Sequence, residues 1–277
     1  MKKNKDRNLT SNEKELWKQV VSDVESYSLV NKSFSESNVK KLNKSKKPKF
    51  IALIPARKGS KGLINKNMRN LQKKPLVQHT IEAALGTSQM DEIWVSSNDG
   101  AILKLAESLK VHTVIRPEEY ADDMSSAVEV VNHFLSTISS RENFEDDFIV
   151  YLQPTSPIRN SHHIEAAIEI MLKQNLNSLV SVCLLRKSPY KAFLIDQGGM
   201  LQALFDEELS NARRQDLQNI YIPNGAIYIF QIKEFLDRCG FPSNGSFPFI
   251  MSEDDSTDID EEEDLLKAER IMRIKNA

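Results

Sequence analysis

Short apolar runs alternate with amphipathic stretches between residues 50 and 185. The runs are rich in valine and isoleucine, which is typical of buried β-strands. The stretches between them carry apolar side chains three or four positions apart, which is typical of helices that pack on one face. The predicted strands are 50–54, 92–97, 111–116, 148–153 and 178–185. The predicted helices are 75–86, 101–110, 126–138 and 161–173.

This alternation predicts an α/β fold, with a Rossmann-like, mostly parallel sheet and helices on both of its faces. Ligands of such sheets bind beyond the carboxyl ends of the strands. The segments that follow the strands are therefore expected to meet at one edge of the sheet. These segments read IPARKGSKG, SSND, RPEEY and QPTSPIR.

The alternation stops after about residue 186. Two short apolar runs flank the sequence DQGG at residues 196–199, which predicts a hairpin, and the polar stretch that follows has no clear period. We interpret residues 186–225, approximately, as a small inserted lobe. A strand at 226–230 and a final helix at 261–274 follow it. The acidic start of that helix suits the helix dipole.

Residues 1–48 differ from the rest in composition. Up to residue 49 the chain carries 13 Lys or Arg against 6 Asp or Glu, while the whole chain has a net charge of −2. This indicates a basic N-terminal extension, containing one amphipathic helix, ahead of a domain at 49–277. Because aromatic side chains are sparse in the extension, we interpret it as a solvated tail and predict no nucleic-acid partner.

The composition also bears on where in the cell the protein is expected. The apolar runs are far shorter than the roughly 20 residues of a spanning helix, and the N-terminus lacks the apolar centre of a signal peptide. We therefore predict a cytoplasmic protein without membrane insertion. The 2 cysteines cannot form a disulfide framework.

The loop after the first strand carries four cations and no acid. Arg57, Lys58, Lys61 and Lys66 accompany two glycines in the segment IPARKGSKGLINKN. Backbone amides near glycines and cationic side chains together bind phosphates, so this loop is expected to hold a nucleoside triphosphate. It matches neither the Walker P-loop nor the dinucleotide-binding glycine pattern.

A cluster of acids lies near the other end of the chain. The segment from Glu253 to Asp264 holds nine acidic residues, and Asp258 and Asp260 alternate with an isoleucine. Two carboxylates on one side of an extended segment, next to phosphates, are a usual way to hold Mg²⁺. The alternative is a solvated acidic turn that caps the final helix.

Five segments in this order resemble the acylneuraminate cytidylyltransferases, also called CMP-sialic acid or CMP-nonulosonic acid synthetases. They read IPARKGSKGLINKN, RPEEYADD, LQPTSPIR, IPNGAIY and DIDEEEDL, and the resemblance spans residues 50 to about 273. It implies the nucleotide-diphospho-sugar transferase type of fold. It also implies transfer of CMP from CTP to the C2 hydroxyl of a nine-carbon 2-keto sugar acid, with Mg²⁺ or Mn²⁺ as cofactor and release of pyrophosphate.

The resemblance also implies roles for particular residues. Triphosphate and nucleotide would be held by Arg57, Ser60, Lys61, Lys66, Asn67, Arg116, Ser125 and Ser126. The sugar acid would contact Gln153, Thr155, Ser156, Lys191, Arg214 and Asn224. The metal would bind Asp258 and Asp260, and Arg57, Lys61 and Lys66 would join these two acids in catalysis. In the family the lobe crosses to a second subunit, which implies a homodimer.

The chain departs from the family pattern at three places. Asn98 stands where many relatives have an acid, residues 124–127 read MSSA rather than TASS, and Ile222 stands where an arginine is frequent. Loss of that arginine leaves sialic, legionaminic and pseudaminic types of acid open. Two further alternatives are activation of the eight-carbon 3-deoxy-manno-octulosonate and an inactive nucleotide-binding partner protein. No residue is assigned as the general base.

Overall fold

The computed structural model describes residues 47–59, 62–122 and 125–275. The predicted N-terminal helix, Ser60 and Lys61 lie outside these ranges. The division into an extension and a domain stays a prediction. Among the described helices, none combines the length and the apolar character that crossing a membrane requires.

Seven strands form the central sheet, in the order β11-β7-β10-β6-β1-β4-β5. Their bounds are β1 Phe50–Pro55, β4 Glu92–Ser97, β5 His112–Ile115, β6 Phe148–Tyr151, β7 Ser178–Leu184, β10 Tyr221–Gln231 and β11 Phe247–Ile250. All neighbouring pairs are parallel except those of β10, which runs antiparallel to β6 and β7. Strand β1 is central and almost wholly buried, as its unbroken apolar run requires of a parallel strand covered on both faces.

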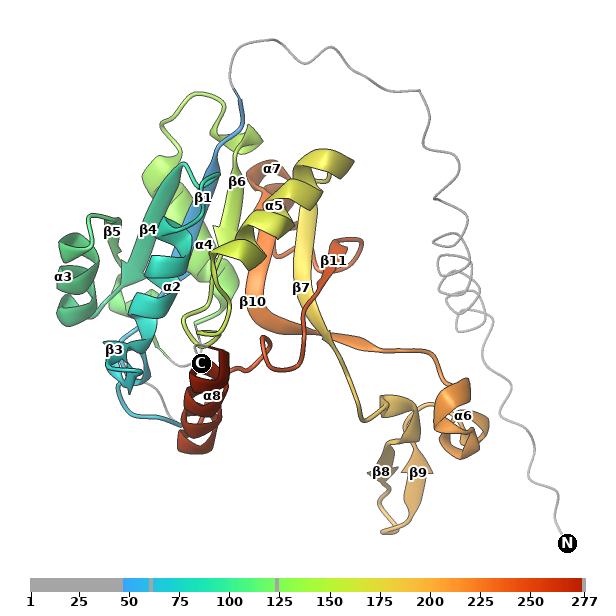
Figure 1. Cartoon of the computed structure of the whole chain (residues 1–277). Helices are drawn as coiled ribbons and strands as arrows, with labels where there is room; N and C mark the ends of the chain where they lie inside the picture. The colour runs from blue at the N-terminus through green and yellow to red at the C-terminus, as the bar shows by residue number, and fades with distance from the viewer. Residues whose placement is uncertain (1–46, 60–61, 123–124, 276–277) are drawn as a thin grey trace, which may run out of the picture. The chain divides into compact units, whose positions relative to one another are not determined.

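Helices cover both faces of the sheet (Figure 1). One face is covered by α2 Leu76–Leu85, α3 Gly100–Ser108 and α5 Ser161–Gln174. The other face is covered by α4 Ala127–Ile138 and α7 Ile232–Arg238. The predicted fold class is therefore confirmed. The final helix, α8 Glu262–Lys275, buries Leu265 and Ala268 in a third apolar cluster with Leu63 and Ile259.

Shorter elements connect these layers. They are η2 Lys66–Met68, β2 Asn70–Leu71, β3 Lys74–Pro75, η3 Glu118–Tyr120 and η4 Phe144–Asp146. The strands β2 and β3 pair with each other in a small antiparallel ladder. It leads directly into α2, whose first residue Leu76 donates its backbone N–H to the carbonyl of Arg69 at 2.8 Å.

The segment between β7 and β10 forms a small lobe that stands away from the sheet (Figure 1). It contains η5 Pro189–Lys191, β8 Phe193–Ile195, β9 Leu201–Ala203, α6 Glu207–Asn211 and η6 Arg214–Asp216. Strands β8 and β9 pair antiparallel around the DQGG turn, which confirms the predicted hairpin. Asp196 closes that turn by accepting the Gly198 N–H at 2.9 Å.

Candidate active site

The carboxyl ends of β1, β4 and β5 meet at one edge of the sheet. The Ala56 N–H donates to the carbonyl of Ser96, and the Arg116 N–H donates to the carbonyl of Ser97, both at 2.9 Å. Beyond β1, the Lys58 N–H donates to Oδ1 of Asn98 at 2.7 Å. The segments that follow these strands therefore contact one another, as expected for a ligand-binding edge.

The loop after β1 meets the acidic segment before α8. Lys66 Nζ lies 2.9 Å from Oδ1 of Asp260, although 194 residues separate them. The two backbones are also close, because a Cβ atom added to Gly62 would lie 2.5 Å from the Asp260 carbonyl oxygen. The Asp260 N–H in turn donates to Oδ2 of Asp264 at 3.0 Å. The cationic loop and the acidic segment thus form one site.

Asp258 and Asp260 share this site because the residue between them is anchored. Ile259 is fully buried beneath α8, and its N–H donates to the carbonyl of Thr155 at 2.8 Å. The Thr155 hydroxyl donates to the carboxylate of Asp258. The loop after β6 therefore fixes both the backbone and one side chain of the acidic segment.

The carboxyl group of Asp258 has a raised pKa. The residue keeps exposed surface, but protein atoms crowd its carboxyl group, and this partial desolvation is the main cause. The neighbouring carboxylates of Asp260 and Asp264 raise the pKa further, while the Thr155 hydroxyl and Lys66 oppose the rise. A cation bound between these acids would offset their repulsion.

The donor set fits a magnesium ion. Mg²⁺ usually takes one or two carboxylates and completes its shell with water and substrate phosphates. Asp258 and Asp260 supply two carboxylates that are close enough to repel each other. The protein thus offers an open set of ligands that suits an ion shared with a phosphate.

Asn67 supports the loop from inside. It is 8% exposed, and its Nδ2 donates to the carbonyl of Arg57 at 2.9 Å. Just before it, Asn65 adopts a left-handed conformation with φ of 53°. The turn that these residues form brings Lys66 toward Asp260. The predicted contributions of Ser60 and Lys61 fall on residues outside the described ranges.

Arg116 lies at the end of β5 with only 4% of its surface exposed. Its Nε donates to Oγ of Ser96 at 3.1 Å, and its Nη2 donates to the Ser96 carbonyl at 2.8 Å. Burial lowers the pKa of Arg116 to about 10, with repulsion from Arg57 adding to the effect. The guanidinium remains charged at neutral pH, so this edge of the sheet carries a fixed positive charge.

Ser125 and Ser126 use their hydroxyl groups locally. Oγ of Ser125 donates to Oδ1 of Asp122 at 2.9 Å. Ser126 is the N-cap of α4, where its Oγ accepts the Glu129 N–H at 3.2 Å and its own N–H donates to the Glu129 carboxylate at 2.6 Å. This is a capping box. A contact of either serine with a nucleotide base stays a prediction.

Gln153 lies in the loop after β6 and faces a bulge in β10. A Cβ atom on Gly225 would lie 2.6 Å from Oε1 of Gln153, and Gly225 has a φ of +75°. The positive φ favours glycine at this position, and an added Cβ would displace the end of the Gln153 side chain. Ser156, fully buried, donates weakly to the Asn224 carbonyl at 3.5 Å. Four of the predicted sugar residues, Gln153, Thr155, Ser156 and Asn224, are thereby brought together.

The amide of Asn224 is engaged inside the protein. Oδ1 accepts the hydroxyl of Ser181 at 2.5 Å and the N–H of Ala226 at 3.2 Å. Nδ2 donates to Oγ of Ser256 at 2.8 Å. Asn224 therefore holds the bulge of β10 against β7 and against the segment that leads to Asp258.

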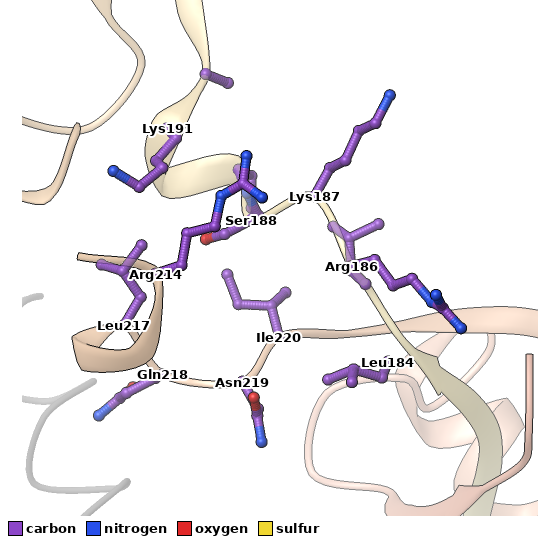
Figure 2. A pocket seen from close by; sticks show the side chains of 13 residues that line it. Leu184, Arg186, Lys187, Ser188, Lys191, Arg214, Leu217, Gln218, Asn219 and Ile220 are labelled. Carbon is purple, nitrogen blue, oxygen red and sulfur yellow. The ribbon is translucent and has the colours of Figure 1, made fainter. Parts of the chain in front are cut away.

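Lys191 and Arg214 lie in a different part of the chain from Gln153. They line a cavity of about 570 Å³ at the base of the lobe, together with Arg186, Lys187, Ile220 and eight other residues. Figure 2 shows Lys191 and Arg214 among the side chains that line this cavity, on two segments of the lobe. Lys191 Nζ donates to the carbonyl of Ser210 at 3.0 Å. Within one chain, Lys191 and Arg214 line the cavity of the lobe, and Gln153 is not among the residues that line it.

The burial of Arg159 and the two hydrogen bonds of the Asn98 side chain were not predicted from the sequence. Arg159 lies behind Gln153 and is 1% exposed, which no local pattern in SPIRN indicates. Asn98 accepts from Lys58 through Oδ1 and donates to Glu118 through Nδ2 at 3.0 Å. An amide suits this place, because one of its neighbours is a donor and the other is a carboxylate.

Comparison with known proteins identifies the class of protein to which this α/β fold and its ligand-binding edge belong. The family described as Cytidylyltransferase matches residues 51–276. Among solved structures, CMP:2-keto-3-deoxy-manno-octonic acid synthetase complexed with CTP shares the fold, with a TM-score of 0.59 at 17% identity over 82% of this chain and 99% of that chain.

The chain is also similar to curated proteins of the same kind. It is 37% identical to an N-acylneuraminate cytidylyltransferase of Escherichia coli, over 82% of this chain and 53% of that protein. It is 34% identical to the CMP-N,N'-diacetyllegionaminic acid synthase of Legionella pneumophila, over 82% of this chain and 97% of that protein. The chain belongs to the cytidylyltransferase family. It spans about half the length of the N-acylneuraminate cytidylyltransferases that it matches.

Proposed function

We propose that this chain transfers the cytidylyl group of CTP to the C2 hydroxyl of a nine-carbon 2-keto sugar acid and releases pyrophosphate. The observation that carries this proposal is the contact between the cationic loop and the acidic segment, where Lys66 Nζ lies 2.9 Å from Asp260 Oδ1. Membership of the cytidylyltransferase family supports a cytidylyl group as the group that is transferred. The relatives named for N-acylneuraminate, diacetyllegionaminic acid and pseudaminic acid support an acid of the nine-carbon class.

The triphosphate would lie along the loop after β1. Arg57, Lys61 and Lys66 would neutralise its oxygens, helped by backbone N–H groups and by Ser60. Arg57 and Lys66 follow the carboxyl end of β1, where ligands of parallel sheets bind. Asn67 and Arg116, with Ser125 and Ser126, would border the nucleoside.

In the reaction, the C2 hydroxyl oxygen attacks the α-phosphorus of CTP, the hydroxyl loses its proton, and the bond from the α-phosphorus to the bridging oxygen of pyrophosphate breaks. Asp258 and Asp260 would hold Mg²⁺ or Mn²⁺, which when bound spreads the negative charge that grows on the phosphate oxygens. Lys66 would then exchange Asp260 for a phosphate oxygen. The base that takes the proton is not assigned.

The sugar acid would lie against the loop after β6 and the bulge of β10. Gln153 and Thr155 are half-buried there, and Ser156 and Asn224 support them from within. Ile222, 40% exposed, precedes this bulge in β10, where family members frequently have an arginine. The proposed substrate is therefore a nine-carbon acid of the sialic, legionaminic or pseudaminic type, without a choice among the three.

We also propose that the active form is a homodimer joined through the lobe. Seven large apolar side chains of the lobe are between 42% and 74% exposed, namely Phe193, Leu194, Ile195, Met200, Leu201, Leu204 and Phe205. An apolar set of this size on a small hairpin suits a second copy of the chain. Lys191 and Arg214 would then complete the sugar site of the partner subunit, supplying cations for the carboxylate.

The test is release of pyrophosphate from CTP and Mg²⁺ in the presence of a panel of acids. The panel contains N-acylneuraminic, legionaminic and pseudaminic types of nine-carbon acid and the eight-carbon 3-deoxy-manno-octulosonate. We expect release with at least one nine-carbon acid, and a rate lower by roughly 100-fold or more for Asp258→Asn. The proposal is contradicted if pyrophosphate is released only with the eight-carbon acid, or if none of the acids in the panel leads to release.

A further inference from the structure

Arg159 is a buried cation whose hydrogen bonds all go to neutral groups. It is 1% exposed and lies just before α5. Its Nη2 donates to the Thr80 hydroxyl at 2.8 Å and to the Gln153 carbonyl at 3.1 Å, and its Nε donates to the Ala226 carbonyl at 3.3 Å. Among the described residues, no carboxylate pairs with it and its Nη1 has no partner.

Burial of a guanidinium without a carboxylate is costly for folding. Burial lowers the pKa of Arg159 to about 9, which still leaves the group charged at neutral pH. An apolar residue of similar size would avoid this cost if the position served packing alone. The charge is therefore expected to serve something besides stability.

The three acceptors of Arg159 belong to three different parts of the fold. Thr80 is in α2, the Gln153 carbonyl is in the loop after β6, and the Ala226 carbonyl is in the bulge of β10. The residue before Ala226 is Gly225, against which the Gln153 side-chain amide packs. Arg159 thus fixes the backbone on both sides of the contact that orients this amide.

We propose that Arg159 is a positioning residue for the sugar acid, which acts by holding the Gln153 amide against the bulge of β10. This inference rests on the proposed function, in which Gln153 faces the sugar. A planar guanidinium suits this role, because its separate N–H donors bind the carbonyls of Gln153 and Ala226 at the same time. A lysine keeps the charge but lacks the fixed geometry of the guanidinium.

The experiment compares Arg159→Lys and Arg159→Met in the full chain, with steady-state kinetics for CTP and for the acid separately. We expect kcat/KM for the acid to fall about 10- to 100-fold in both variants, as for a small misplacement of a binding group. The KM for CTP is expected to stay within about twofold, because the triphosphate loop has no contact with Arg159 among the described residues. Far-UV circular dichroism and melting temperature report folding.

Thr80→Val is the matched control. It removes one acceptor of the same guanidinium and lowers stability, but it leaves the bonds to Gln153 and Ala226 in place. We expect its kinetics with the acid to remain within about twofold of the parent. An equal kinetic loss in Thr80→Val would mean that the kinetics follow a general loss of packing rather than the bonds to Gln153 and Ala226, and would overturn the proposal.

A double-mutant cycle with Gln153→Ala separates positioning from general damage. If Arg159 acts through Gln153, then Arg159→Lys costs no further activity once Gln153 is alanine. Independent, multiplying losses would overturn the proposal, as would an Arg159→Lys variant with parental kinetics. Failure of the parent chain to release pyrophosphate with any nine-carbon acid would instead overturn the proposed function, so the two failures are distinguishable.

Discussion

Lys66 Nζ lies 2.9 Å from Oδ1 of Asp260, and the pair joins two segments of the chain that are 194 residues apart. The lysine side chain is 14% exposed and the aspartate side chain 73% exposed. Exposure of one partner to water makes the pair a weak contributor to stability, typically below about 1 kcal/mol. The main effect of this ion pair is therefore to place a cation next to the acidic segment, rather than to stabilise the fold.

Replacement of Lys66 should separate activity from stability. We expect Lys66→Met to lower kcat/KM for CTP by roughly 100-fold, since the cation that we propose for a phosphate oxygen is lost. The melting temperature should change by only a few degrees, because the ion pair is partly exposed. Lys74→Met is the control, since Lys74 forms an exposed pair with Glu82. A loss of activity as large in Lys74→Met would argue against a specific role for Lys66.

Gly62 offers a second test of the same contact. An added Cβ would lie 2.5 Å from the Asp260 carbonyl oxygen, so Gly62→Ala must push the loop and the acidic segment apart. We expect CTP binding, measured by calorimetry, to weaken at least tenfold, since the lysine and the aspartates lose their alignment. Gly100→Ala is the matched control, because a Cβ there meets nothing within 4 Å. Unchanged CTP affinity in Gly62→Ala would contradict the single site inferred here.

Glu92 gives a prediction about pH. Partial burial alone would raise the pKa of Glu92, but hydrogen bonds from Lys49, Trp94 and Arg141 outweigh it and bring the pKa to about 2. The folded state thus favours the ionised form. Its contribution to stability is complete above the unfolded pKa of about 4.3 and is lost as the pH falls through about 2.

We therefore expect Glu92→Gln to lower the free energy of unfolding by about 1–3 kcal/mol at pH 7. The difference from the parent should shrink steadily between about pH 5 and pH 2, as the parent loses the same charge. Urea unfolding followed by fluorescence at several pH values measures both chains. Glu145→Gln, an exposed residue in η4, is the control and should show little effect at any of these pH values. A difference that stays constant with pH would contradict this assignment.

The sequence predicted most of the sheet because its strands are short apolar runs that local periodicity reveals, as in residues 50–54. It also predicted the hairpin around DQGG, where Asp196 and two glycines favour a turn. The antiparallel direction of β10 was missed, because periodicity is the same for both directions. Strand β11, with its single proline and four residues, gave too short a pattern.

Some features of the candidate site were likewise predictable from the sequence, and others were not. The meeting of Lys66 with Asp260 was predictable from complementary charge and from the rule that strands end at one edge. Burial of Arg159 was not, because its acceptors Thr80 and Ala226 lie 79 and 67 residues away. The spacing of Ser126 and Glu129 is typical of the capping box that the structure shows, whereas the nucleotide contact that the resemblance implies for Ser126 stays a prediction.

The lobe provides the last prediction. If its exposed apolar side chains meet a second copy, a charge in their midst should keep the copies apart, since a buried unpaired carboxylate is costly. We expect light scattering to give a dimer for the parent chain and a monomer for Leu201→Asp at micromolar concentration. The monomer should keep CTP binding, because the loop after β1 is intact, but lose transfer to the acid, because Lys191 and Arg214 no longer reach a partner's site. Ile274→Asp is the control, with Ile274 77% exposed in α8 outside the lobe. A parent chain that is monomeric and fully active would refute this role for the lobe.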